Sequence, residues 1–272
     1  MPIYNLAYWS QNRPWISWTP QTNSHILQMT TYKISTTPPE PWTPWANTLV
    51  YYDFETDTLP TITNKGTWWS SMDGTASNIT IQTLASWKKV AENTSNSKNN
   101  WIISNWTQTV PSAVTQWCWI KTATATNNRW WSFGFNWSNG IYLLEANSNG
   151  AGTWFQWYKL NPSPEAWVFF AGTGTSVSDG NWHLVTWTYD ALNGNKFYVD
   201  GNVQTMSYNQ WSTSSDPTAL LAMNIRVMKT SNNGYNWSFV WQCWCYWLED
   251  KSRTAQEISD YYNQTKWDYW IS

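Results

Sequence analysis

The segment 178–201, SDGNWHLVTWTYDALNGNKFYVDG, alternates apolar and polar residues with a period of two. Val185 and Tyr189 fall on one face of a first strand, and Phe197 and Val199 on one face of a second, because side chains alternate across a pleat. Asn193-Gly194 and Asp200-Gly201 supply residues that tolerate positive φ in short turns. The pattern predicts two successive hairpins and hence an antiparallel sheet.

Similar patterns recur along the chain and predict further strands. These cover residues 25–34, 48–55, 79–84, 113–121, 139–145, 153–160, 166–171, 220–228 and 237–248. One helix follows, because Thr254 and Glu257 form a capping box and Ile258 with Tyr261 or Tyr262 forms an apolar stripe. We therefore predict an all-β domain with a short C-terminal helix.

The segment 35–47 carries four prolines, which enforce extended backbone and exclude a central strand. This composition predicts an N-terminal arm at 1–34, a Pro-rich linker at 35–47 and one domain at 48–272. The first 25 residues lack the basic start and apolar centre of a signal peptide.

The motif at 178–201 resembles the laminin G-like (LamG), concanavalin A-like lectin/glucanase family, in which this region runs DG-x-WH followed by TYDG and LYVDG. Trp182, His183, Tyr189, Asp190, Asp200 and Gly201 carry the resemblance as a structural motif. It extends over residues 49–265 and implies a two-sheet antiparallel jelly roll that binds glycans or proteins at cell surfaces. The chain departs from the family at 237–248, where Trp244 and Cys245 replace the usual acidic pair.

Charge excludes several classes of function. Charged residues make up 12% of the chain, the net charge is −2 and the pI is about 5.6, so no electrostatic footprint for nucleic acid exists. No apolar run is long enough to span a membrane.

Two groups of residues could hold a metal ion. Asp53, Glu55 and Asp57 would project to one side if the strand at 48–55 continued, and their oxygens suit Ca²⁺. The alternative is a solvated strand end. The 3 cysteines are an odd number, which argues against a disulfide framework. Cys243 and Cys245 would share one strand face, where we expect apolar packing rather than a metal site.

An enzymatic function has little support in the sequence. Retaining glucanases of this fold need the pattern Glu-x-Asp-x-x-Glu, because two carboxyls must flank the bond that breaks. Glu55 and Asp57 begin this pattern, but Pro60 stands where the second glutamate belongs. The 2 histidines, His25 and His183, are far apart in sequence, and His183 is expected to be a packing residue. We therefore predict no catalysis.

Tryptophan is far too abundant, at 27 residues against 12 glycines. Glycine is usually about 7% of a chain, or about nineteen residues here. Many tryptophans, such as Trp68-Trp69 and Trp130-Trp131, have loop-type neighbours where glycine would be expected. We hypothesise that many of these positions are UGA codons that the source reads as glycine, with Trp119 and Trp182 genuine. The competing interpretation is a Trp-rich surface that stacks on sugars.

These observations favour a carbohydrate- or surface-binding (adhesion) module of a cell-surface or phage tail-type protein, located outside the cell, on its surface or on a virion. A structural module of a tail fibre or surface layer is the alternative, and a glycoside hydrolase a weaker one. Calcium is the only cofactor considered, a glycan or cell-surface ligand is the expected partner, and the sequence does not select ligand-binding residues.

Overall fold

The computed structural model describes residues 45–93, 101–109, 111–122, 130–135, 143–148, 153–159, 166–172, 177, 179–210, 222–229 and 241–269. The chain divides into two units, Met1–Thr43 and Pro44–Ser272, and the described residues all belong to the second. The predicted arm, most of the linker and the predicted strand at 25–34 lie outside the described residues.

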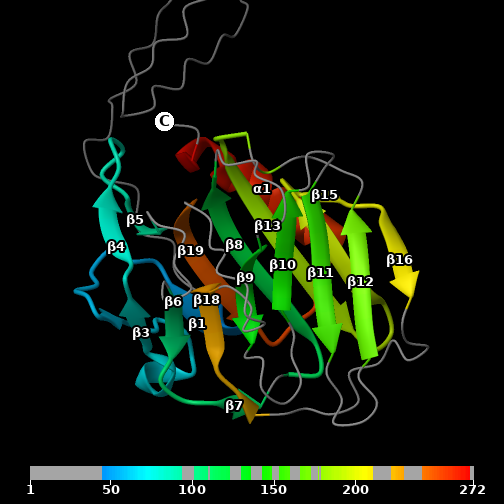
Figure 1. Cartoon of the computed structure of the whole chain (residues 1–272), viewed down its shortest axis with the longest axis horizontal. Helices are drawn as coiled ribbons and strands as arrows, with labels where there is room; N and C mark the ends of the chain where they lie inside the picture. The colour runs from blue at the N-terminus through cyan, green and yellow to red at the C-terminus, as the bar shows by residue number, and fades with distance from the viewer. Residues whose placement is uncertain are drawn as a thin grey trace, which may run out of the picture. The chain divides into compact units, whose positions relative to one another are not determined.

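Sheet A has eight strands in the order β15-β14-β13-β8-β19-β5-β4, with β1 also paired to β19 (Figure 1). Its strands are β1 (Thr48–Tyr52), β4 (Thr80–Thr83), β5 (Lys89–Asn93), β8 (Val114–Lys121), β13 (Trp182–Asp190), β14 (Gly194–Val199), β15 (Asn202–Val203) and β19 (Trp241–Glu249).

Sheet B has nine strands in the order β16-β12-β11-β10-β9-β18-β6-β3-β2. They are β2 (Thr61–Ile62), β3 (Gly74–Ser77), β6 (Trp101–Ser104), β9 (Trp130–Phe135), β10 (Leu143–Ser148), β11 (Thr153–Lys159), β12 (Ala166–Gly172), β16 (Met206–Gln210) and β18 (Ile225–Lys229). A separate pair joins β7 (Gln108–Thr109) to β17 (Ala222–Met223), and a 3-10 helix, η1, spans Trp69–Met72.

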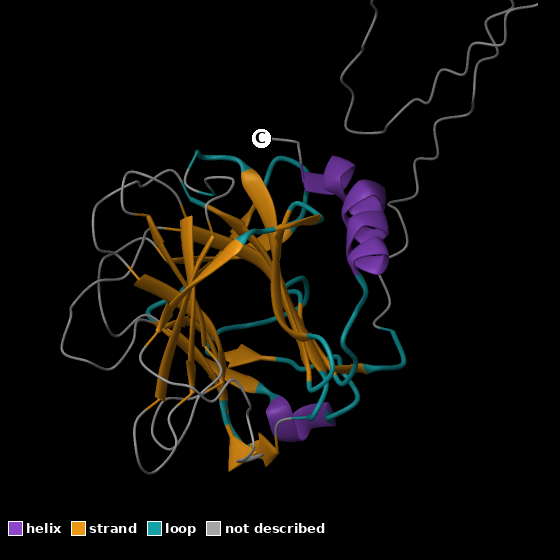
Figure 2. Cartoon of the chain, turned by 90° about the vertical axis from the view of Figure 1, so that its right-hand side faces the viewer, coloured by secondary structure: helices purple, strands orange, loops and turns teal. Residues whose placement is uncertain are grey.

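The two sheets face each other as a sandwich, and the helix α1 (Ala255–Tyr269) lies on the outer side of sheet A (Figure 2). The described strand pairings are antiparallel, as the hairpin pattern predicted. The all-β, two-sheet fold with a C-terminal helix is therefore confirmed.

The core lies between the sheets because each central strand turns alternate apolar residues inward. On β8 these are Cys118 and Ile120, while Trp117 and Trp119 point to the opposite, helix-covered face. On β13 they include Val185 and Tyr189, which confirms the predicted face. Full burial of one such side chain stabilises the fold by about 1.5–3 kcal/mol before the entropy cost of ordering it.

The two predicted hairpins form, but their turns differ. At the second turn, Asp200 and Gly201 both have positive φ, 53° and 77°, as a two-residue primed turn requires. At the first, only Gly194 has positive φ, 65°, and β13 pairs Asp190 with Gly194. The first loop is therefore longer than the Asn193-Gly194 turn that the sequence suggested. The Asp190 carboxylate fixes it by accepting hydrogen bonds from the backbone N–H groups of Leu192 and Asn193 at 2.9 and 2.7 Å.

The first strand ends earlier than predicted. β1 stops at Tyr52, and Phe54 adopts a positive φ of 61° with its ring fully buried in the core. The chain bends here because burial of an aromatic side chain can outweigh the cost of about 1–2 kcal/mol for a left-handed backbone. The premise that residues 53–57 continue the strand is therefore wrong.

The expected common face of Cys243 and Cys245 is also wrong. A β-bulge interrupts the pairing of β19 with β8, so that Cys243 lies opposite Ile120 and Cys245 opposite Trp119. Ile120 faces the core and Trp119 faces the helix, and Cys243 accordingly belongs to the core whereas Cys245 does not. The extra residue reverses the alternation that the sequence spacing implied.

The helix forms as its sequence predicted. The Thr254 hydroxyl accepts a hydrogen bond from the Glu257 backbone N–H at 3.2 Å, and the Glu257 carboxylate accepts one from the Thr254 N–H at 2.8 Å. This is the capping box. Ile258 and Tyr261 are buried against sheet A. There the Tyr261 ring packs edge-on against the Trp117 ring, with 5.2 Å between the two ring centroids.

Candidate functional site

The residues of the central motif are brought together where β13, β14 and the turn before β13 meet. Nδ1 of His183 lies 2.7 Å from Oδ2 of Asp200, and Nε2 lies 2.9 Å from Oδ1 of Asp179. The other oxygen of Asp200 accepts a hydrogen bond from the Leu184 backbone N–H at 3.0 Å. We name Asp179, His183 and Asp200 the histidine clasp.

Electrostatics explain what the histidine clasp does. Burial disfavours the charged imidazole, but the hydrogen bonds and charges of Asp200 and Asp179 outweigh burial and raise the pKa of His183. Both ring nitrogens are held, so the imidazole ties the turn at 179 to the turn at 200.

The remaining motif residues have separate positions. Trp182 and Tyr189 are buried on β13, and Asp190 caps the first hairpin loop. Gly201 packs directly under the helix, where an added Cβ would lie 3.1 Å from Ser259 Cα and 3.2 Å from Tyr262 Cβ. The motif residues thus stabilise sheet A and form part of the surface on which the helix packs.

The three acidic residues considered for calcium lie in the bend after β1. Asp53 pairs with the Lys65 ammonium at 2.5 Å and accepts a hydrogen bond from the Glu55 backbone N–H at 3.2 Å. Asp57 accepts one from the Thr63 N–H at 2.9 Å, and burial raises the pKa of both Asp57 and Glu55. Within the described residues, no three His, Cys, Asp or Glu side chains come together as a metal site. Calcium binding at these residues stays a prediction.

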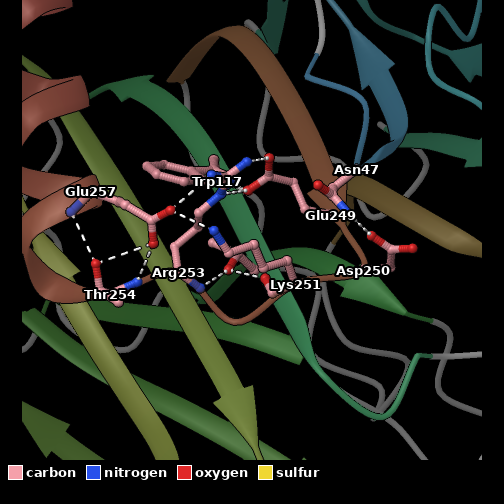
Figure 3. Close-up of polar contacts among 9 residues, drawn as sticks. Asn47, Trp117, Glu249, Asp250, Lys251, Arg253, Thr254 and Glu257 are labelled. Carbon is pink, nitrogen blue, oxygen red and sulfur yellow. Dashed lines mark hydrogen bonds and ion pairs between the residues drawn. The ribbon is translucent and has the colours of Figure 1, made fainter.

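A larger polar network joins the end of β19 to the start of α1 (Figure 3). Glu249 is fully buried, and its carboxylate accepts two hydrogen bonds from Arg253, at 2.7 and 2.9 Å, and one from the Trp117 indole N–H at 2.9 Å. Arg253 also donates to Glu257 at 3.0 Å, and Lys251 pairs with Glu257. We name Glu249, Arg253 and Glu257 the helix anchor.

The contacts of the helix anchor suit a structural role rather than a catalytic one. Burial raises the pKa of Glu249 even though Arg253 and Trp117 oppose the shift. At Glu257, hydrogen bonds from Lys251, Thr254 and Arg253 outweigh burial and lower the pKa to about 2. Both carboxylates are occupied by the same guanidinium, so neither is left to act as an acid or a nucleophile.

The described surface presents two strongly exposed tryptophans in very different settings. Trp106 is 66% exposed and lies in the loop after β6. Two side chains hold its backbone carbonyl in place, which accepts hydrogen bonds from Ser104 Oγ at 2.9 Å and Asn224 Nδ2 at 3.1 Å. Beside it, the Asn105 N–H donates to the Asp73 carbonyl at 2.8 Å, and Thr75 Oγ1 donates to Asn105 Oδ1 at 2.6 Å.

Trp87, 77% exposed, lies in the turn between β4 and β5 with φ of 67° and two lysines after it. Such a backbone is rare for a bulky residue and natural for glycine. Trp106 is not among the residues with positive φ. The backbone therefore fits the recoding hypothesis at Trp87 and makes no demand for glycine at Trp106.

Sequence reasoning left several of these residues unselected. Trp106 and Asn224 are 118 residues apart, and no sequence pattern announces their contact. The helix anchor carried a signal only at Glu257, through its capping box with Thr254, because Glu249 and Arg253 precede α1 and their four-residue spacing is not helical. Asp179 stands inside the family motif, at the Asp of DG-x-WH.

The described residues include no helix with the length and apolar character that crossing a membrane requires. Comparison with known protein families and with curated protein sequences finds no match.

Solved structures of toxin binding domains share the fold. The binding domain of botulinum neurotoxin serotype D matches with a TM-score of 0.60 and 12% identity, over 81% of this chain and 51% of that one. The binding domain of Paraclostridial Mosquitocidal Protein 1 matches with a TM-score of 0.58 and 12% identity, over 80% and 52%. A botulinum neurotoxin type C structure, whose cell entry depends on two ganglioside molecules, matches with a TM-score of 0.58 and 12% identity, over 80% and 51%.

The chain spans about half the length of these structures. At this identity the likeness establishes the β-sandwich and leaves LamG membership a prediction.

Proposed function

We propose that this chain is a non-enzymatic binding module that holds carbohydrate, or another ligand on a cell surface, and serves adhesion. The exposed Trp106 loop carries the proposal. An indole face offers a rigid apolar platform for a sugar ring, and amide and hydroxyl groups beside it can bond the sugar hydroxyls. Asn105, which precedes Trp106, and Thr75, whose hydroxyl bonds to Asn105, would provide such groups.

The rigidity of the loop supports this role. Ser104 and Asn224 fix the Trp106 carbonyl, and Asn105 is fixed through its backbone N–H. A preformed loop loses little conformational freedom on binding, so more of the contact energy becomes affinity. The fold adds weak support, since the solved structures that share it include binding domains and a toxin that interacts with gangliosides.

Several described carboxylates are already paired, which favours binding over hydrolysis. A retaining glycosidase needs two carboxyl groups about 5–5.5 Å apart and accessible to the sugar. Instead, Glu249 and Glu257 share Arg253, Asp53 pairs with Lys65, and Asp200 holds His183.

A structural role in a tail fibre or surface layer is a second candidate. Its support is the Pro-rich segment at 35–47, whose composition suits a stiff spacer between this module and a larger assembly. Either role would place the chain outside the cell, on its surface or on a virion.

A glycan array with the full chain, run with and without EDTA, tests the proposal. We expect retention on a defined set of glycans, lost in Trp106→Ala and kept in Trp87→Ala, which removes an exposed tryptophan from another loop. Loss with EDTA would support calcium at Asp53, Glu55 and Asp57. Retention on no glycan would overturn carbohydrate binding in favour of the structural role, and release of reducing sugar from β-glucans would overturn the non-enzymatic assignment.

A further inference from the structure

Two buried thiols lie against each other in the middle of sheet A. Sγ of Cys118 on β8 and Sγ of Cys243 on β19 are 3.4 Å apart, and both residues are fully buried. The two cysteines are 125 residues apart in sequence, so their contact exists only in the folded sheet.

The register of β19 on β8 brings them together, and the β-bulge in β19 turns Cys245 away. Cys243 lies opposite Ile120, two residues from Cys118 on β8, while Tyr246 lies opposite Cys118 itself. Cys118, Ile120, Cys243 and Tyr246 all face the core, so Cys243 is a same-face diagonal neighbour of Cys118. Cys245 is opposite Trp119 on the helix-covered face and does not compete for either sulfur.

We propose that Cys118 and Cys243 form a disulfide when the chain folds in an oxidising compartment. Each S–H bond breaks and one S–S bond forms, so two protons and two electrons leave the pair. The electrons reduce the disulfide of a thiol–disulfide exchange partner, such as an oxidoreductase or glutathione disulfide, to two thiols. The path runs through a mixed disulfide, which the second cysteine thiolate then displaces.

Timing follows from burial. Burial, together with the neighbouring Cys243 thiol, raises the pKa of Cys118, and no oxidant reaches a fully buried sulfur. The bond must therefore form once β8 and β19 have paired but before the core closes over the sulfurs, and once formed it is shielded from reductants. A chain that folds under reducing conditions keeps both thiols.

The bond would tie two central strands of sheet A. β8 and β19 are neighbours, and β19 leads directly into the helix. A crosslink that closes so long a loop removes much freedom from the unfolded chain. Cys245 would take no part in this bond, which agrees with the odd number of cysteines. The inference does not depend on which ligand the chain binds.

Refolding the full chain in a glutathione redox buffer, with fully reduced refolding alongside, tests the proposal. After denaturation and alkylation, we expect the oxidised sample to carry one modified cysteine, Cys245, and one linked peptide pair containing Cys118 and Cys243. We expect the melting temperature to exceed that of the reduced sample by about 5–15 °C.

Three variants that each replace one cysteine decide the test even if one of them folds poorly. Cys245→Ser should keep the linked pair and the shift, whereas Cys118→Ser and Cys243→Ser should lose both. Three alkylated cysteines in the oxidised wild-type chain, or a link that uses Cys245, would overturn the proposal.

Discussion

The histidine clasp and the helix anchor are both built from carboxylates around one cation, yet they differ in depth and in the kind of cation. The helix anchor buries Glu249 completely beneath a guanidinium that stays charged at every accessible pH. The histidine clasp surrounds an imidazole with two partly exposed carboxylates. The first should behave as a permanent brace and the second as a pH-dependent one.

The turn at Asp200-Gly201 connects the two. Asp200 belongs to the clasp, while Gly201 lies against the helix that the anchor holds. This connection explains how one short motif can fix both the sheet and the helix. The structure thus assigns its most elaborate polar contacts to the scaffold.

The largest effect is expected at the anchor. Arg253→Met leaves the buried Glu249 carboxylate without its counter-ion, which should lower the free energy of unfolding by about 3–5 kcal/mol. Urea unfolding at pH 7 measures the loss. Lys251→Met, which removes a cation from the partly exposed Glu257 pair, is the matched control and should cost less than about 1 kcal/mol. Equal losses in the two variants would remove the distinction between a buried brace and a surface ion pair.

The junction between clasp and anchor comes next. Gly201→Ala meets both a positive φ and the helix, so we expect a loss of about 2–4 kcal/mol in the free energy of unfolding. Gly194→Ala is the control, because Gly194 has a similar φ but no atom within 4 Å of the added Cβ. Its expected cost is about 1–2 kcal/mol from the backbone alone. An equal loss of unfolding free energy in the two variants would mean that contact with the helix adds nothing to the cost of a Cβ at position 201.

His183→Gln should lower the free energy of unfolding by about 1–3 kcal/mol at pH 6. The pKa of His183 is raised in the folded chain, above an unfolded value of about 6.5. The clasp's contribution is therefore complete below about pH 6.5 and is lost as pH rises through the folded pKa. Urea unfolding from pH 6 to pH 9 should show the gap between wild type and variant shrinking. A gap that stays constant would mean that folding does not raise the pKa of His183.

The smallest expected effect on stability concerns the surface. Trp87→Gly should raise the free energy of unfolding by about 1 kcal/mol, because glycine adopts the positive φ at this turn without strain. The same position tests the recoding hypothesis through the gene. We expect UGA at codon 87, and UGG there and at most other tryptophan positions would refute the hypothesis.

The strands that could be predicted are long ones rich in apolar residues. Residues 113–121 and 153–160 match β8 and β11 to within one residue. In the polar stretch 61–100 only the strand at 79–84 was predicted, and β2, β3 and β5 were missed. Strands of two to five residues rich in Thr, Ser and Lys carry too little periodicity to be recognised.

Side-chain contacts could be predicted only where both partners lie close together in the sequence. The capping box of Thr254 and Glu257 could be recognised because both partners lie within one helical turn. The faces of Cys243 and Cys245 could not, since the β-bulge depends on how β19 pairs with β8. Exposure of Trp106 is likewise a property of the folded surface, and spacing along the chain does not encode it.

Calorimetric titration of one array-selected glycan into the full chain tests the central claim most directly. We predict that Trp106→Ala weakens the affinity about tenfold or more, equivalent to about 1.4 kcal/mol, because aromatic anchors dominate such contacts. Trp87→Ala should bind like the wild type. Unchanged affinity in Trp106→Ala, in a variant that unfolds at the wild-type urea concentration, would contradict the proposed site.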